Sequence, residues 1–469
     1  AAYWALAGGS LQKFRVALIP SRGQQVVEAG PRVALGEPTQ AAQVTRRRDA
    51  AFLVVRSLNS AEYKAVLLNL DTGELRWQRQ LGLIPAAPPI RQDGTVVLAA
   101  EAGSLVAIPA GGVAAGRTTV APPAWVVGLP PEQITGPTRV AVAPDGSSAY
   151  TVTPVAVTED GKAVGKYVVR RVAGGRVAYE GVVTSPGAIA GNPVVLGNNL
   201  LIPASDGFVH RYTAGTGRTN PDAITPGPAW AGLTRAADAE CFITPLSDSA
   251  FLTGDGGKKL ESWAWPRGGG WSKGPGKWDL PVAVAGPGVL LPPRSPGEAA
   301  RVLFADVGGT IRLYAADRGG DPLKLWRPGG ETYPAGKPTS PPVTQPDAAG
   351  RPVVAVVIED RIVLCIDPEK DAPLWVARTG EGPEAAIIGA PQPAGTGRWL
   401  LTNLGGEAVV YEANGNPGPK LPAALPGAVP ARPAALVGPA DVLAPLSDGS
   451  VVALSLPTEA PPPDAAPKK

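Results

Sequence analysis

Short runs of alternating apolar and polar residues, separated by turns rich in glycine, asparagine and aspartate, recur along the chain. A representative segment is NPVVLGNNLLIPASDGFVHRY, which begins at Asn192 and alternates on both sides of two turns. A period of two is typical of β-strands with one buried face, and Asp206-Gly207 is a strong two-residue hairpin signal. The chain has no sustained run of apolar residues spaced three and four positions apart, which is the pattern that indicates amphipathic helices. The pattern therefore predicts an all-β protein built from hairpins.

The hairpins repeat at a regular interval. Turns that would separate the two middle strands of successive units fall near Asn59, Gly103, Gly161, Gly207, Gly257, Gly309, Asp360, Gly406 and Gly449. The last eight are about 49 residues apart, which suits a four-stranded unit that buries its faces against its neighbours. We predict a β-propeller of four-stranded antiparallel blades. Eight blades fit best, with the ninth hairpin in an appended or split unit, and seven or nine remain alternatives.

The end of the chain suggests how such a ring would close. The final unit shows three strands and is followed by PTEAPPPDAAPKK, so we expect residues 1–456 to form a single propeller and residues 457–469 a proline-rich flexible tail or linker. A fourth strand supplied by the other terminus would remove two exposed sheet edges. Residues 11–19, LQKFRVALI, have the β-rich composition for this role.

Composition and charge narrow the classes of partner. The 59 glycines and 54 prolines accompany 44% hydrophobic residues, as expected for many short strands joined by turns. The net charge is only +3 and the cations are scattered, apart from Arg46, Arg47 and Arg48, so we expect no nucleic-acid partner. The longest weakly charged stretch, residues 421–446, contains six prolines, which excludes a membrane-spanning helix there.

Candidate chemistry is sparse. The chain has one histidine, His210, no methionine and two distant cysteines, Cys241 and Cys365, which argues against haem, copper, zinc and iron–sulfur sites of ordinary ligation. We expect two buried thiols, with a disulfide as the alternative. The densest acidic clusters, 359–360 and 369–371, fall at predicted turns, where solvated side chains are the ordinary interpretation. We therefore expect no metal, no cofactor and no enzymatic activity.

One segment has an unusual composition. Four tryptophans, Trp263, Trp265, Trp271 and Trp278, fall within sixteen residues beside Arg267. Tryptophan buries a large area and still offers one N–H donor, so this group is a candidate protein-binding surface. The alternative is structural: Trp263 and Trp265 would share one face of a strand, and the others would fill the gap between two blades.

The sharpest copy of the repeat is VLLNLDTGELRW, which carries Asp71, Thr72, Gly73 and Trp77. This phrase resembles the β-propeller repeats of the pyrroloquinoline quinone (PQQ)-like family, in which Asp, a Thr-Gly turn and Trp mark the passage from third to fourth strand. Less complete copies keep Asp367 with Trp375, and Trp326. The resemblance implies that the Asp accepts backbone hydrogen bonds in the turn. It also implies that the Trp fills the outer gap between blades.

The PQQ-like family contains both enzymes and scaffolds. Its quinoprotein dehydrogenases hold PQQ with calcium, and many carry a disulfide between adjacent cysteines, which this chain lacks. Its non-catalytic members include the eight-bladed lipoprotein of the bacterial outer-membrane β-barrel assembly machinery, and this sequence is more similar to that group. We hypothesise a non-enzymatic scaffold that binds one or more protein partners in an extracytoplasmic bacterial assembly, periplasmic or at the cell surface. A PQQ-dependent oxidoreductase and a carbohydrate-binding propeller are the alternatives.

Overall fold

The computed structural model describes most of the chain between Ala2 and Ser455. The described residues are 2–7, 10–19, 24–34, 39–47, 50–57, 63–69, 72, 74–81, 85–109, 123–129, 133–214, 224–226, 230–231, 241–254, 256–265, 272–329, 335–421, 432–436, 441–446 and 451–455. The predicted tail, residues 457–469, lies outside this set.

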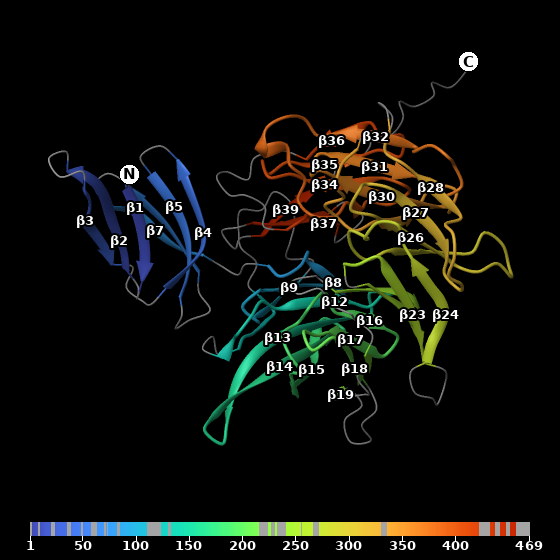
Figure 1. Cartoon of the computed structure of the whole chain (residues 1–469), viewed down its shortest axis with the longest axis horizontal. Coiled ribbons are helices and arrows are strands. Elements are labelled where there is room, and N and C mark those ends of the chain that lie inside the picture. Colours follow the sequence, from blue (N-terminus) through green and yellow to red (C-terminus); the bar gives the residue numbers. More distant parts are fainter. Residues whose placement is uncertain are drawn as a thin grey trace, which may run out of the picture.

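Eight antiparallel sheets follow one another from residue 90 to residue 455 and form an eight-bladed β-propeller (Figure 1). This confirms the predicted fold class and blade number. Within each blade consecutive strands pair in chain order, except that β20 (Trp230–Ala231) pairs with β18 (Phe208–Ala214). The blades are numbered here from first to eighth in chain order.

The strands of the first four blades are as follows. The first contains β8 (Ile90–Gln92), β9 (Thr95–Ala99), β10 (Leu105–Pro109) and β11 (Trp125–Val127). The second contains β12 (Arg139–Val142), β13 (Ser148–Glu159), β14 (Lys162–Ala173) and β15 (Arg176–Thr184). The third contains β16 (Val194–Leu196), β17 (Asn199–Pro203), β18 (Phe208–Ala214), β19 (Ile224–Pro226) and β20 (Trp230–Ala231). The fourth contains β21 (Phe242–Ser247), β22 (Ala250–Gly254), β23 (Lys259–Ala264) and β24 (Ser272–Asp279).

The remaining four blades complete the ring. The fifth contains β25 (Val289–Leu291), β26 (Arg301–Ala305), β27 (Ile311–Ala315) and β28 (Lys324–Trp326). The sixth contains β29 (Val343–Pro346), β30 (Pro352–Ile358), β31 (Ile362–Ile366) and β32 (Trp375–Arg378). The seventh contains β33 (Gln392–Pro393), β34 (Trp399–Thr402), β35 (Ala408–Tyr411) and β36 (Pro417–Lys420), preceded by the 3-10 helix η3 (Pro383–Ala385). The eighth contains β37 (Ala435–Leu436), β38 (Asp441–Pro445) and β39 (Val451–Ser455).

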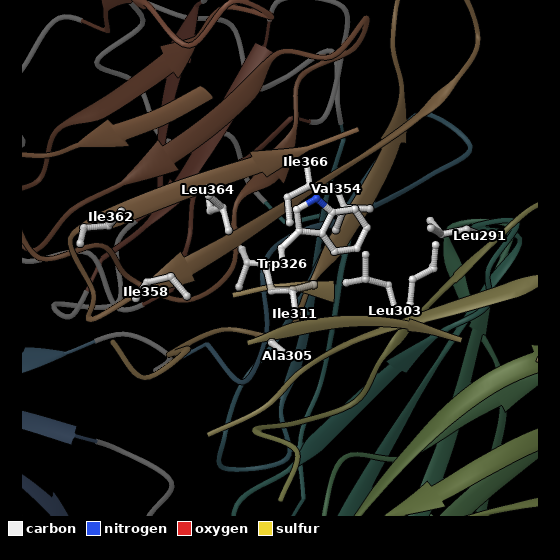
Figure 2. Close-up of a cluster of buried hydrophobic side chains, with 12 residues drawn as sticks. Leu291, Leu303, Ala305, Ile311, Trp326, Val354, Ile358, Ile362, Leu364 and Ile366 are labelled. Carbon is white, nitrogen blue, oxygen red and sulfur yellow. The ribbon is translucent and has the colours of Figure 1, made fainter. Parts of the chain in front are cut away.

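The hydrophobic core is divided among the seams between neighbouring blades. In the seam between the fifth and sixth blades, Leu303 and Ile311 of one sheet meet Val354 and Leu364 of the next (Figure 2). Trp326 lies in the same cluster and is 2% exposed. The sixth blade has a second apolar cluster on its other face, against the seventh blade, so neither of its faces could stay out of water without a neighbouring blade.

Seven strands precede the ring and form two further sheets, drawn beside it in Figure 1. The first sheet contains β1 (Ala2–Ala7), β2 (Ser10–Ile19) and β3 (Gln24–Ala34). The second contains β4 (Thr39–Arg47), β5 (Ala50–Ser57), β6 (Tyr63–Asn69) and β7 (Leu75–Leu81), and holds the ninth predicted hairpin. The prediction that residues 11–19 close the ring is wrong. These residues belong to β2, whose two edges already pair with β1 and β3, so no edge is left for β39.

The ring closes instead through side chains of the first and eighth blades. Val96 of β9 and Leu443 of β38 are fully buried against each other. Beside them Arg432 donates from Nε to the carbonyl oxygen of Pro85 at 3.0 Å, and from Nη2 to Glu101 Oε1 at 2.7 Å. These contacts join residues more than 300 positions apart in the chain.

Replacing Arg432 with alanine is expected to loosen this closing seam. Because the Arg432 and Glu101 side chains are 39% and 29% exposed, solvent screens the pair and the expected loss is about 1 kcal/mol of unfolding free energy. Hydrogen exchange should accelerate in β9 and β38 more than in the fifth and sixth blades. The control is Arg351→Ala, which removes an ion pair with Asp347 within one hairpin. Equal acceleration in all blades would contradict a local closing role.

Candidate functional site

One face of the ring, called here the entry face, carries the segments that lead into each blade. In six blades, the residue five positions before the first strand forms a β-bridge with a residue of the second strand or the turn after it. The pairs are Pro85–Ala100, Ile134–Val155, Ile189–Ala204, Val284–Asp306, Pro338–Ile358 and Ile387–Asn403. The hairpin turns between second and third strands and the entering segments therefore lie together on this face.

A cavity of about 460 Å³ is formed mainly by the entering segments of four successive blades. Its walls include Val194, Phe242 and Val284, which come from the third, fourth and fifth blades. Lys337 and Thr339 add polar atoms from the sixth blade. Val307, which lines the same cavity, is 40% exposed. The cavity therefore has a largely apolar lining with a few polar side chains.

A second cavity, of about 550 Å³, lies between the second and third blades and is called here the groove. Its lining includes Arg139, Gly165 and Lys166 of the second blade. The segment 185–189, which enters the third blade, forms another part of the lining. Tyr167 donates a short hydrogen bond to the carbonyl oxygen of Gly187, which links the second blade to the segment that enters the third.

Polar side chains in the hairpin turns of this face stabilise the turns. Asp306 Oδ1 accepts hydrogen bonds from the backbone N–H groups of Gly308 and Thr310, and its Oδ2 pairs with Arg312 at 2.9 Å. The only histidine has an equivalent place: His210 Nε2 lies 2.8 Å from Asp206 Oδ2. These carboxylates hold the backbone of their own turns, as Asp does in tight turns generally.

The two acidic clusters do not form a joint site. Glu359 and Asp360 occupy a hairpin turn at positive φ, and Glu359 accepts a hydrogen bond from the Lys337 backbone. Glu369 lies in a different turn, which reaches across the seam to the fifth blade. It pairs with Arg301 at 2.5 Å and with Arg294 at 2.7 Å. Burial raises the pKa of Glu369, but the hydrogen bonds and charges of the two arginines outweigh burial, and the pKa lies below its ordinary value.

This pair makes the seam between the fifth and sixth blades sensitive to acid. The folded pKa of Glu369 is lowered, so its stabilising contribution is complete above the ordinary value of 4.5 and is lost as pH falls through the folded pKa. The urea midpoint of the wild-type protein should therefore fall more steeply below pH 4.5 than that of Glu369→Gln. The control is Glu298→Gln, at an exposed position of the fifth blade. Parallel curves for wild type and Glu369→Gln would contradict this account.

The described residues offer little for metal or nucleophilic chemistry. Within them no three His, Cys, Asp or Glu side chains are grouped closely enough to hold a metal ion. Cys241 and Cys365 lie in the fourth and sixth blades, and no disulfide joins them. Burial raises the pKa of the Cys365 thiol to about 12, so it stays protonated at neutral pH and is a poor nucleophile.

The tryptophan-rich segment contributes to two seams. Trp263 is buried with Leu201 and Phe251 in the seam between the third and fourth blades, and Trp265 packs at the edge of that cluster. Trp278 is buried with Val302 and Phe304 in the seam between the fourth and fifth blades. Arg267 and Trp271 lie outside the described residues. Of the described members, Trp265 alone is partly exposed, so the protein-binding role of the group stays a prediction.

In the first, fifth and sixth blades, a tryptophan makes the same hydrogen bond to the next blade. The sequence repeat identified two of these three tryptophans. Trp326 donates from Nε1 to the carbonyl oxygen of Lys370, and Trp375 donates to that of Ala413. Each acceptor lies in the next blade, in the turn between its third and fourth strands. Asp367 accepts a hydrogen bond from the backbone N–H of Glu369 in such a turn. Trp125 makes the same contact with Gly175, but no Asp or Thr-Gly precedes it to reveal the repeat.

The sharpest copy of the repeat lies outside the ring. Trp77 belongs to β7 and pairs with Leu67 of β6. Thr72 is exposed and accepts a hydrogen bond from the backbone N–H of Glu74. Asp71 and Gly73 lie outside the described residues. The sheet β4–β7 thus shares the strand order of a blade, although it stands beside the eight that close the ring.

The described part of the chain contains no helix that is long and apolar enough to cross a bilayer.

Comparison with known proteins identifies the fold. No family model and no curated protein match this sequence. Among solved structures, the chain is similar to BamB from Moraxella catarrhalis, with a TM-score of 0.50 and 13% identity over 80% of this chain and 98% of that chain. It is also similar to the C-terminal WD40 domain of Sif2, with a TM-score of 0.55 and 10% identity over 80% of this chain and 97% of that chain. Sqt1 from Saccharomyces cerevisiae has a TM-score of 0.52 and 12% identity over 68% of this chain and 82% of that chain. These structural matches show a shared fold, and the chain is an eight-bladed β-propeller protein.

Proposed function

We propose that this protein is a non-enzymatic scaffold that binds a protein partner through its entry face. The observation that carries the proposal is the pair of hollows on this face, each lined by residues of more than one blade. Exposed apolar side chains occupy turns of the same face: Val307 in the fifth blade and Leu404 in the seventh are 40% and 43% exposed. Val307 also lines the first cavity, and exposed apolar side chains beside a hollow are typical of protein-binding surfaces.

The rigid ring suits this role. Its seams are closed by buried apolar clusters and by hydrogen bonds between blades, so the turns of the entry face keep a fixed spacing. Fixed turns lose little conformational entropy on binding, which favours affinity. We further propose that the ring belongs to the PQQ-like repeat type and works outside the cytoplasm as a subunit of a larger assembly. The Trp326 and Trp375 contacts and the fold shared with BamB support this finer assignment.

The test compares exposed apolar positions on and off the entry face. Partners that co-purify with the full chain from its native source are identified by cross-linking and mass spectrometry. The partner that binds most tightly is then titrated against variants of the chain. Val307→Asp and Leu404→Asp are expected to weaken binding at least tenfold. The matched control is Leu323→Asp, which changes a residue 50% exposed that lies between the third and fourth strands of its blade.

Two results would overturn the proposal. One is loss of binding with Leu323→Asp while both entry-face variants bind normally. The other is stoichiometric quinone in the purified protein together with dye-linked oxidation of an alcohol or sugar, which would assign an enzymatic role to the ring.

A further inference from the structure

One hairpin of the entry face is much longer than the others. β13 and β14 are 12 residues each, whereas the second strands of the other seven blades are 4 to 7 residues long. The register between them is regular from Ser148–Ala173 to Glu159–Lys162. Residues 156–165, called here the arm, form the outer part of this hairpin and extend past the bridge between Ile134 and Val155.

Apart from one contact at Gly165, the arm is a two-stranded ribbon without described neighbours at its edges. On one side, β12 pairs with β13 only as far as Val152. On the other side, the β14–β15 ladder begins at the Lys166–Thr184 pair, and the last contact is from Ser185 N–H to the Gly165 carbonyl at 3.3 Å. The next residue, Pro186, has no N–H and cannot continue the ladder. The edge of β14 from residue 162 to 164 is therefore open within the described structure, and at Gly165 only the carbonyl oxygen is paired.

An open strand edge is a template for another strand, and this one leads into the groove. Gly165, Ser185 and Gly187 line the groove at the point where the ladder ends, so small residues leave room for a backbone to approach. A Cβ atom added at Gly165 would lie 3.7 Å from the Ser185 Cβ, at ordinary contact distance. The groove therefore lies beside β14 where β15 no longer pairs with it, in line with the position of a further strand.

The charged side chains that line the groove are all positive. Arg139 and Lys166 are its only charged residues, and no carboxylate lines it. Lys166 pairs with Glu159 at 3.1 Å within the hairpin, and Arg139 is half-buried at the start of β12. A half-buried guanidinium favours a carboxylate that can bind it through two hydrogen bonds. The groove is therefore complementary to an acidic side chain.

We propose that the open edge of the arm and the groove bind an extended acidic segment of a partner protein. The segment would add a strand to β14 through backbone hydrogen bonds and place an Asp or Glu side chain beside Arg139. Main-chain pairing would supply the affinity and the carboxylate the specificity. This inference rests on the proposed scaffold function and names the chemistry of one partner segment.

The experiment uses a random library of eight-residue peptides selected on the full chain. Three variants accompany it. In the short-arm variant, residues 156–165 are replaced by Asn-Gly, which closes the Val155–Lys166 pair with a two-residue turn. Arg139→Gln removes one of the two cations that line the groove. Arg176→Gln, at the exposed first residue of β15 in the same blade, is the matched control. Thermal unfolding establishes that each variant folds.

Selected peptides are expected to be rich in Asp or Glu and to lack proline at their centre. Their affinity should fall at least tenfold with Arg139→Gln, vanish with the short arm and stay unchanged with Arg176→Gln. Peptide binding should slow hydrogen exchange at residues 162–165. If the short-arm variant fails to fold, replacing Glu by Gln in the best peptide gives the same comparison on the wild-type chain, with a tenfold loss expected.

Several outcomes would overturn the inference. Selection that yields no arm-dependent peptide, or peptides that bind the short-arm variant equally well, would exclude strand addition. A dimer that the short arm disperses, without peptide binding, would assign the edge to a second copy of this chain. A native partner that binds the short-arm variant normally but not Val307→Asp would leave the scaffold function standing and reject the acidic segment.

Discussion

Replacing Trp326 with alanine is expected to lower the free energy of unfolding by about 3–5 kcal/mol, as for other large-to-small changes in packed cores. The Trp326 ring is 2% exposed and lies among Leu303, Ile311 and Val354 in the seam between the fifth and sixth blades (Figure 2). Its indole N–H also binds the Lys370 carbonyl of the next blade at 3.1 Å. Alanine would lose both contributions and leave a cavity that two rigid sheets cannot close.

Urea denaturation of Trp326→Ala and Trp326→Phe separates packing from hydrogen bonding. Phenylalanine keeps most of the apolar contact but leaves the Lys370 carbonyl without its indole donor, so a smaller loss of about 1–3 kcal/mol is expected. An alanine variant as stable as the phenylalanine variant would show that the seam does not depend on this side chain.

The second large effect is expected at the ion pair of the fifth blade. The Asp306 side chain is 1% exposed and the Arg312 side chain 11% exposed. Arg312→Met would leave a buried carboxylate with backbone donors alone, at an expected cost of about 3–5 kcal/mol. The double variant Asp306→Asn with Arg312→Met should lose less, because no uncompensated charge remains.

The measurement for this pair is a double-mutant cycle of unfolding free energies. The two single variants and the double variant are compared by urea denaturation at neutral pH. If the double variant loses as much as the sum of the single variants, the coupling between Asp306 and Arg312 is absent and the pair does not stabilise the turn.

Most of the ring could be predicted from the sequence because its strands carry their signals locally. Alternation around Gly207 and Gly309 fixes the faces of each hairpin, and both glycines have the positive φ that such turns require. The spacing of these turns then gives the number of units. Closure of the ring is different, because Arg432 and Glu101 are 331 positions apart and no local pattern connects them.

The candidate site was less visible in the sequence for a related reason. The tryptophan-rich segment is conspicuous by composition, yet Trp263 and Trp278 are buried in opposite seams of one sheet. The groove is formed mostly by glycine, proline and serine, which the sequence presents as ordinary turn residues. The groove exists because the β14–β15 ladder stops at its edge. Where a ladder stops depends on how the strands pair in the folded sheet, and no single segment of the sequence shows it.

The closure of the ring between its first and eighth blades also determines where the chain enters and leaves the ring. The two N-terminal sheets join the ring just before Pro85, and the chain leaves β39 after Ser455, so both connections arise at the same seam. A protein tethered through either connection would be held near one sector of the circumference. The opposite sector, formed by the fourth and fifth blades, would point away from that tether and stay open to the surroundings.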